Sequence, residues 1–272
     1  MTRQDRFSRR LFLADLGRGT VALAVVGIAG CGPARSSATA AASNASPGAS
    51  VSASAVPSAG SVAPSAASPA GPSTAAGGGT TWERVDLGFV SAYVLARGGE
   101  AAVVDTGTAG SEDDIAAGLE RIGLGWDAVG HVILTHLHGD HIGSLGAVLD
   151  AAADATGYAG PEDLPGISAP RPLVAVADGD DVFGLTIVAT PGHTPGSISV
   201  LDEAGGVLVA GDALGTTGGA VQGSNPQFTA DMDAAMASVA KLGALQFETL
   251  LVGHGDPILG GASELVAAAA AG

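Results

Sequence analysis

The sequence predicts an α/β domain with two layers of β-sheet and helices on the outside. Three observations favour this fold class. Short aliphatic runs of strand length recur along residues 85–252, segments with helical spacing lie between them, and an Asp or a His repeatedly follows a run. Polar residues at strand ends are typical of a rigid sheet that presents side chains at one edge.

The strands are expected in two groups along the chain. Residues 85–87, 93–96 and 101–105 are separated by glycine-containing turns, which predicts a meander, and residues 131–135 read as a buried strand. In the second group, the segments "LTIVATPGH", "SISVLD", "GVLVAGD" and "TLLVGHGD" each contain a short strand that ends at a polar residue. The two groups predict the two layers of sheet.

Four helices are expected between and after these strands. Ser111 with Asp114 three residues later resembles a capping box, and apolar residues at helical spacing follow. Residues 145–153 predict a second helix. Two further helices are expected to be capped by Thr229 and Ser263.

The first 30 residues have the layout of an export signal, with arginines ahead of a short uncharged apolar run. That run is shorter than the ~20 residues of a membrane-spanning helix, so cleavage is expected. The segment "SRRLFLA" resembles a twin-arginine signal, and "IAGC" resembles a lipobox that ends at Cys31. We expect a lipoprotein anchored through Cys31 on the outer, cell-surface or periplasmic side of a membrane. The alternative is a chance arginine pair and an ordinary cysteine.

Composition divides the rest of the chain into a tether and a folded domain. Residues 31–80 are almost wholly Ala, Ser, Pro, Gly and Thr and cannot bury a core. Residues 81–272 are enough for a substantial core. Because Cys31 is the only cysteine of the sequence, the domain has neither a disulfide nor a thiolate metal ligand.

The predicted domain is strongly acidic. Residues 81–272 carry 25 Asp and Glu against five Arg and Lys, a formal charge of −20. Such a surface repels phosphate backbones and anionic lipids, which argues against nucleic acid and against membrane contact other than through the lipid on Cys31. A small-molecule substrate is the expected partner, and the sequence does not indicate an oligomeric state.

The segment "THLHGDH" contains four candidate metal ligands: His136, His138, Asp140 and His141. Three more candidates follow later strands: His193, Asp212 and His254. Five of the six histidines therefore lie at strand ends beside two carboxylates. This set of nitrogen and oxygen donors suits Zn²⁺, Mn²⁺ or Fe.

Four separated motifs, "THLHGDH", "PGHTPGS", "GDAL" and "VGHGDP", resemble the signature motifs of the metallo-β-lactamase superfamily, and "VVDTG" resembles its first motif. The resemblance implies an αββα four-layer sandwich of two mixed sheets. It implies a first metal on His136, His138 and His193, a second on Asp140, His141 and His254, and Asp212 as the bridge.

Two further residues have open roles in this comparison. Asp105 would orient a ligand or fix the ligand loop, although an Asp before Gly107 is equally typical of a turn. His131 matches no motif position and is expected to be structural.

The resemblance implies a hydrolase with two divalent cations, most simply zinc, that activate water while Asp140 handles the proton. Asp212 favours the glyoxalase II and lactonase-like branches, because β-lactamases of the superfamily usually carry Cys or Ser there. The alternatives are a mononuclear iron enzyme resembling persulfide dioxygenases, a true β-lactamase, and a non-catalytic surface lipoprotein that binds a metal or ligand.

The loops 157–172 and 214–228 are expected to line the mouth of the site. Arg171 is the only cation in these loops, so the sequence lacks a basic cluster for glutathione or coenzyme A. A neutral or weakly charged ester, lactone or thioester is therefore the expected substrate.

Overall fold

The computed structural model describes residues 73–74 and 78–271. The predicted signal, Cys31 and most of the predicted tether lie outside the described residues. The fold begins before residue 81, because Ser73–Thr74 pair with the following strand as β1. Thr80 is also buried, and its backbone N–H and hydroxyl donate to Asp202 Oδ2 at 2.6 and 2.7 Å.

Seven strands form the first sheet, in the order β1 to β7. The pairs from β1 to β4 are antiparallel, and those from β4 to β7 are parallel, so the sheet is mixed. Its strands are β1 (Ser73–Thr74), β2 (Thr81–Asp86), β3 (Ser91–Arg97), β4 (Glu100–Val104), β5 (Val129–Ile133), β6 (Thr156–Ala159) and β7 (Val174–Ala175).

Six strands form the second sheet, in the order β15-β14-β11-β10-β9-β8. It is also mixed, since β11 and β14 are parallel and the other pairs are antiparallel. Its strands are β8 (Asp181–Val182), β9 (Leu185–Ala189), β10 (Ile198–Asp202), β11 (Val207–Val209), β14 (Thr249–Leu251) and β15 (Ile258–Leu259). A separate hairpin joins β12 (Leu214–Thr217) to β13 (Ala220–Gly223).

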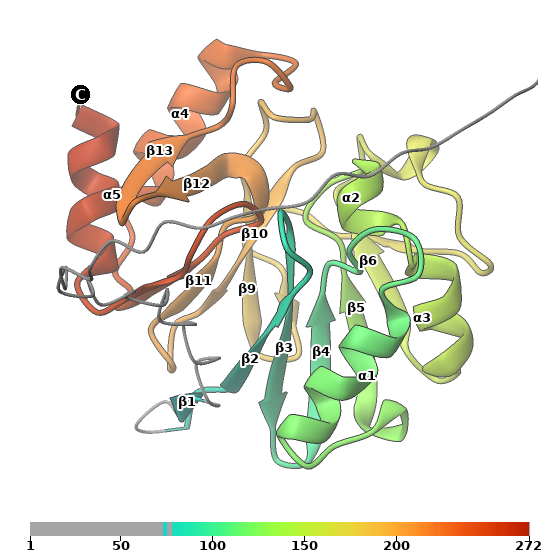
Figure 1. Ribbon diagram of the computed structural model, residues 1–272. Coiled ribbons are helices and arrows are strands. Elements are labelled where there is room, and N and C mark those ends of the chain that lie inside the picture. The colour runs from blue at the N-terminus through green and yellow to red at the C-terminus, as the bar shows by residue number, and fades with distance from the viewer. Residues whose placement is uncertain (1–72, 75–77, 272) are drawn as a thin grey trace, which may run out of the picture. The chain divides into compact units, whose positions relative to one another are not determined.

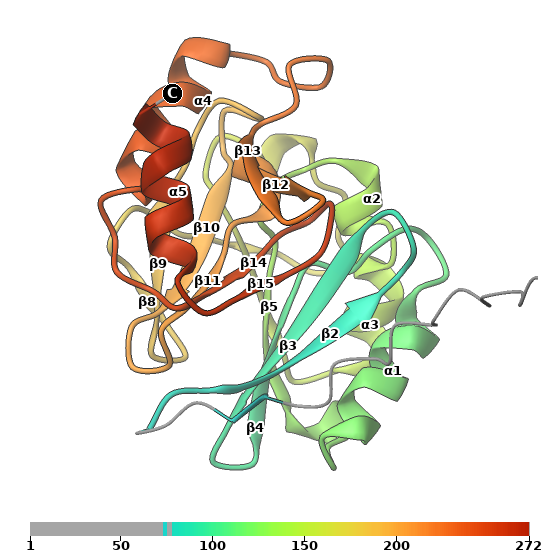
Figure 2. The same ribbon diagram turned by 60° about the vertical axis from the view of Figure 1, so that its left-hand side comes forward.

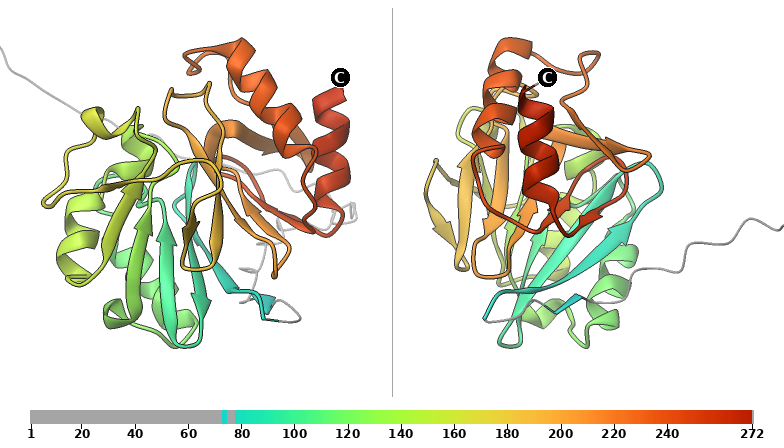
Figure 3. Two further views of the ribbon diagram at one scale, coloured as in Figure 1. Left: turned by 180° about the vertical axis from the view of Figure 1, so that it is seen from behind. Right: turned by 90° about the vertical axis from the view of Figure 1, so that its left-hand side faces the viewer.

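The helices cover the outer faces of the two sheets. Helices α1 and α3 lie on one side of the sandwich and α4 and α5 on the other, with both sheets between them (Figures 1 and 3). The predicted four-layer α/β sandwich is thus confirmed. The helices are α1 (Glu112–Arg121), α2 (Gly139–Ile142), α3 (Leu145–Ala151), α4 (Met232–Leu242) and α5 (Ala262–Ala271), with 3₁₀ turns at Trp126–Ala128, Leu164–Gly166 and Gly211–Ala213.

Strand β3 shows why both sheets are apolar. Ala92 and Val94 pack in the outer layer against α1 and α3, whereas Tyr93 and Leu95 pack in the layer between the sheets. Successive side chains of a strand point to opposite faces, so a sheet covered on both faces needs an apolar residue at every position. A third cluster fills the space between the second sheet and α4 and α5.

Ser111 is the N-cap residue of α1, as predicted, but its side chain does not cap the helix, and the predicted caps at Thr229 and Ser263 are wrong. The Ser111 side chain makes no cap hydrogen bond, since its backbone is not extended; its N–H instead donates to Ser144 Oγ. Asp231 caps α4 by accepting from Ala234 N at 3.0 Å, while the Thr229 hydroxyl donates to a loop carbonyl. Ser263 lies inside α5.

Within residues 73–74 and 78–271, no helix is both long enough and apolar enough to cross a membrane.

Candidate metal centre

The seven candidate ligands lie on connections that follow strands of both sheets. His136 and His138 follow β5, and Asp140 and His141 lie on the short helix α2. His193, Asp212 and His254 follow β9, β11 and β14. The β2–β3 connection and the β12–β13 hairpin lie at the same end of the domain as α2 (Figure 2). The tertiary structure therefore gathers the seven predicted residues in one place.

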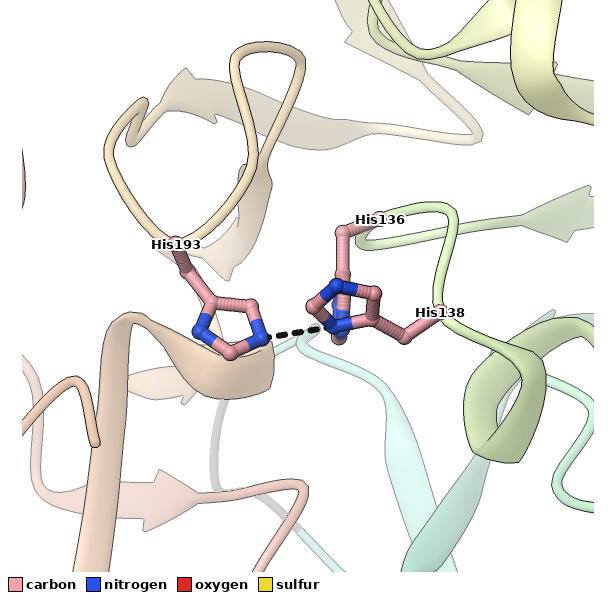
Figure 4. A group of neighbouring side chains, drawn as sticks. All are labelled: His136, His138 and His193. Atoms are coloured by element: carbon pink, nitrogen blue, oxygen red, sulfur yellow. Dashed lines mark hydrogen bonds between the residues drawn. The ribbon is translucent and has the colours of Figure 1, made fainter. Parts of the chain in front are cut away.

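The first group consists of His136, His138 and His193, whose candidate ligand atoms all lie within 4.8 Å of one another. His193 Nε2 and His138 Nδ1 are 2.9 Å apart, and the three rings converge on one point (Figure 4). His136 and His193 are buried, and His138 is half-buried. The first group is therefore largely closed to solvent.

The second group consists of Asp140, His141 and His254. Asp140 Oδ2 is 3.3 Å from His254 Nε2 and 3.9 Å from His141 Nε2, and the two imidazole nitrogens are 3.5 Å apart. His141 is fully buried, but the side chain of His254 is 39% exposed. This group faces the open side of the site.

Asp212 lies between the two groups. Its Oδ2 is 3.3 Å from His193 Nε2 of the first group and 3.2 Å from His254 Nε2 of the second. Its Oδ1 is 3.3 Å from His141 Nε2. One carboxylate thus reaches the imidazoles of both groups.

Two buried polar atoms at this point lack a hydrogen-bond partner among the described residues. They are His136 Nε2 and Asp212 Oδ1. Unpartnered buried polar atoms are costly unless a bound species satisfies them. Imidazole nitrogens and carboxylate oxygens are ligands of divalent zinc, manganese and iron. The residues therefore fit a divalent cation.

Hydrogen bonds at Nδ1 turn the Nε2 atoms of four imidazoles toward the centre. His136 Nδ1 is 3.0 Å from Thr135 Oγ1, and His193 Nδ1 is 3.3 Å from Thr229 Oγ1. His254 Nδ1 donates to the Phe89 carbonyl at 2.6 Å. Such bonds fix the tautomer of a metal-binding imidazole.

Asp105 orients the fourth imidazole. It accepts from His141 Nδ1 at 2.8 Å and also from the backbone N–H and hydroxyl of Thr135, at 2.7 and 2.8 Å. Its φ of 61° lies in the left-handed region, which Asp tolerates better than most residues. Asp105 therefore holds His141 and also the start of the ligand loop.

The electrostatics differ among the ligands. Burial lowers the pKa of His136 well below its usual value and that of His193 to about 4, so both are neutral. Burial also opposes a charge on His141, but the Asp105 and Asp212 carboxylates outweigh it and raise its pKa to about 10. In Asp212, burial raises the pKa, but the neighbouring His141 and His254 imidazoles outweigh burial and lower it.

A cavity of about 1070 Å³ opens directly onto the centre. The predicted loop 214–228 contributes many of its lining residues, as expected. The loop 157–172 does not line it, which corrects that prediction. Arg171 instead donates to the carbonyls of Leu149, Ala152 and Ala155 at 2.8 Å each, where α3 ends. The guanidinium therefore stabilises the carboxyl end of a helix and does not contact the cavity.

Two residues near the site had no distinctive sequence signal. Phe89 lies in the turn between β2 and β3; its ring stacks on His254 and also lines the cavity. Asp163 is fully buried and accepts hydrogen bonds from two ligand loops. In the sequence, Phe89 resembles an ordinary turn residue and Asp163 an ordinary loop residue. Only their tertiary contacts show that they support the candidate ligands.

His131 lies away from the centre, on β5. Its ring packs against Tyr158 and Phe183, and its Nδ1 is 3.3 Å from the Tyr158 hydroxyl. It is not among the residues that line the cavity.

Three curated relatives share much of the chain. It is 30% identical over 196 residues to the uncharacterized protein YobT of Bacillus subtilis, covering 61% of this chain and 83% of the relative. The identity is 33% over 184 residues to the probable metallo-hydrolase YflN of the same organism, covering 52% and 69%. It is 33% over 164 residues to the hydroxyacylglutathione hydrolase of Dechloromonas aromatica, covering 56% and 57%.

Solved structures and a family model agree with these relatives. The crystal structure of TTHA1623 in a di-iron-bound form is 27% identical with a TM-score of 0.54, covering 65% of this chain and 92% of that chain. The model of the metallo-beta-lactamase superfamily matches residues 85–254, which include all seven residues gathered at the centre. Because this match spans well over half of the sequence, the chain belongs to the metallo-beta-lactamase superfamily.

Proposed function

We propose that the protein is a hydrolase with a dinuclear metal centre that cleaves an ester, lactone, thioester or amide bond of a small molecule. The position of Asp212 carries this proposal, since its oxygens lie within 3.3 Å of imidazole nitrogens from both groups. Because these imidazoles belong to two separate groups, the Asp212 carboxylate could contact a cation in each group. The similarity to a probable metallo-hydrolase and to a hydroxyacylglutathione hydrolase supports hydrolysis.

In the proposed mechanism, His136, His138 and His193 would hold one cation, Asp140, His141 and His254 the other, and Asp212 would contact both. Two divalent cations, most simply zinc, would lower the pKa of a water and polarise the substrate carbonyl. Asp140 would take the proton of the attacking water and return it to the leaving oxygen, nitrogen or sulfur, because its partly exposed carboxylate lines the cavity. A carbon–oxygen bond forms as the acyl bond to the leaving group breaks.

Metal analysis and an activity screen on the same purified protein test this proposal. We expect two zinc or manganese ions per chain and hydrolysis of at least one lactone, ester, thioester or β-lactam without oxygen uptake. One iron per chain with oxygen consumption would instead identify an oxygenase. A fully metal-loaded protein with no turnover on any of these classes would indicate a binding protein.

We further propose that the domain is exported and attached to a membrane by a lipid on Cys31, following a signal at residues 1–30 and a tether that ends before β1 (Ser73–Thr74). The proposal rests on the residues "SRRLFLA" and "IAGC" alone. Cys31→Ser should release the protein from the membrane fraction, and Arg9→Lys with Arg10→Lys should stop export. Export that survives the double substitution would contradict the twin-arginine assignment.

A further inference from the structure

The cavity beside the metal centre combines apolar with uncharged polar side chains and, within residues 78–271, lacks Lys and Arg. Among the described residues that line it, none is Lys or Arg, and the only carboxylates are Asp140 and Asp212. The nearby Arg84 is occupied elsewhere: it donates to the Gly255 carbonyl at 3.0 Å and to Asp256 at 3.2 Å. The walls formed by these residues therefore offer uncharged hydroxyl and amide groups but no Lys or Arg as a counter-ion for an anionic group of a substrate.

Five apolar side chains of the described residues line this cavity, two of them phenylalanines. Phe89 and Phe228 line the cavity and are 64% and 61% exposed. Phenylalanine is among the residues that are most often buried. The two side chains come from two separate connections, β2–β3 and β13–α4. The other apolar liners are Leu214, Pro226 and Met232. Exposed apolar side chains gathered in a cavity are typical of a ligand site.

We infer that Phe89 and Phe228 bind the apolar acyl or alkyl group of a neutral substrate, and that the cavity discriminates against substrates with a carboxylate remote from the bond that is cleaved. This inference rests on the proposed hydrolase function. Bound cations would attract an anionic group only next to the reacting carbonyl. A carboxylate further along the cavity would lose water and gain no counter-ion.

Ester pairs that differ only in one group test this inference. The kcat/KM of p-nitrophenyl esters should rise from acetate to hexanoate, by up to about fourfold per buried methylene. The mono-p-nitrophenyl ester of adipic acid, which has the same acyl length as the hexanoate but ends in a carboxylate, should react at least tenfold more slowly. Equal rates for hexanoate and adipate, or no rise with chain length, would overturn the inference and leave the hydrolase proposal intact.

Substitutions of the two phenylalanines test whether they cause the dependence of kcat/KM on chain length. Phe89→Ala and Phe228→Ala should each flatten the dependence on chain length with two metals still bound, and Phe89→Leu should restore part of it. Met236→Ala is the matched control, because Met236 is 58% exposed on α4 but does not line the cavity. Binding of the neutral dye Nile red, followed by fluorescence, gives a readout without turnover. Dye binding that is unchanged in both phenylalanine variants would contradict the inference even if no ester were hydrolysed.

A second inference concerns Asp163, which connects two ligand loops. Its Oδ2 accepts from the backbone N–H of Leu137 at 3.0 Å and from Thr194 Oγ1 at 2.6 Å, and its Oδ1 accepts from the backbone N–H of Gly196 at 2.8 Å. A side chain at position 196 would collide with Asp163, so glycine permits this approach.

We infer that Asp163 is a positioning residue for the first group of candidate ligands. Leu137 lies between His136 and His138, and Thr194 directly follows His193. One buried carboxylate therefore fixes the two loops that must keep all three imidazoles in place. Substitution of such a supporting residue typically lowers metal affinity by about 10- to 100-fold.

Asp202 provides a matched control for this inference. It is also fully buried and accepts from a backbone N–H and hydroxyl of Thr80 and from Gly205 N at 3.0 Å, but it lies where β10 ends, away from the ligands. Asp163→Asn should weaken binding of one zinc per chain by about 10- to 100-fold in competition with a chromophoric chelator. Asp202→Asn should destabilise the protein without changing zinc affinity. Equal zinc affinity of the two variants would show that Asp163 stabilises the fold but does not position the candidate ligands.

Discussion

The first and second groups of candidate ligands form two halves of the metal centre, and the surrounding residues support these halves in different ways. In the first group His136 and His193 are buried and His138 is half-buried, and Asp163 joins the loops that carry them. The second group combines one buried imidazole, held by Asp105, with one exposed imidazole that is held by the Phe89 carbonyl. Both halves border the cavity, through His138 and His193 of the first and Asp140 and His254 of the second, but the His254 side chain is far more exposed, at 39%, than those of His136 and His193. The difference suggests that the first half is built for retention of a cation and the second for access.

Substitution of Asp212 should have the largest effect, because it removes the carboxylate that the halves share. We expect Asp212→Ala to lower kcat/KM by about 1000-fold or more, since several kcal/mol of transition-state stabilisation are lost. Its metal content should fall below two per chain, by atomic absorption on the purified variant. His138→Ala, which removes a ligand of the first half only, is the companion variant and should also be inactive. Full activity in either variant would contradict the proposed dinuclear centre.

Removal of metal should destabilise the halves unequally. Chelation would lower the free energy of unfolding by about 4 kcal/mol for each site if free metal had been near 1000 times Kd, and each site would account for about 8 to 16 °C of the fall in Tm. Hydrogen exchange should then rise more in residues 87–90 of the second half than in residues 192–197, which Asp163 still holds. Uniform loss of protection would contradict the contrast between the halves.

Substitution of Asp105 should weaken the second half from its buried side. Asp105→Asn retains one acceptor but loses the carboxylate partner of His141, so affinity for one metal should fall by about 10- to 100-fold. The metal-free variant should lose about 1 to 3 kcal/mol of stability in urea. His254→Ala provides the exposed counterpart, and the stability of its metal-free form should change by less than about 0.5 kcal/mol.

A smaller effect is expected from Gly253, which contacts the second half without being a ligand. A Cβ at this position would collide with Asp212 Oδ1 and with the His141 ring. We expect Gly253→Ala to lower metal affinity by roughly tenfold, because ligand geometry tolerates little displacement. Gly130→Ala is the control, since a Cβ there meets nothing within 4 Å. Unchanged metal affinity in Gly253→Ala would show that the ligands can shift without cost.

Sequence patterns alone determined the fold class and the gathering of polar residues at strand ends. The order of strands and helices predicted two sheets covered by helices. The resemblance of motifs such as "THLHGDH" indicated seven candidate metal ligands. Local patterns also placed the eight expected strands within a few residues, because apolar runs between glycine turns are typical of buried strands. Short strands such as β6 and β7, and the β12–β13 hairpin, were not predicted, since they lack such runs.

Only the tertiary structure decided what surrounds the ligands. The roles of Phe89, Asp163 and Arg171 depend on contacts between segments far apart in the chain, and a turn phenylalanine or a loop aspartate has no local signal for such contacts. The capping box predicted at Ser111 fails for the same reason, since the Ser111 backbone N–H donates to Ser144, which the sequence could not place near it. Short-range chemistry thus predicts the ligands, whereas their support and the shape of the cavity depend on the packing of distant loops.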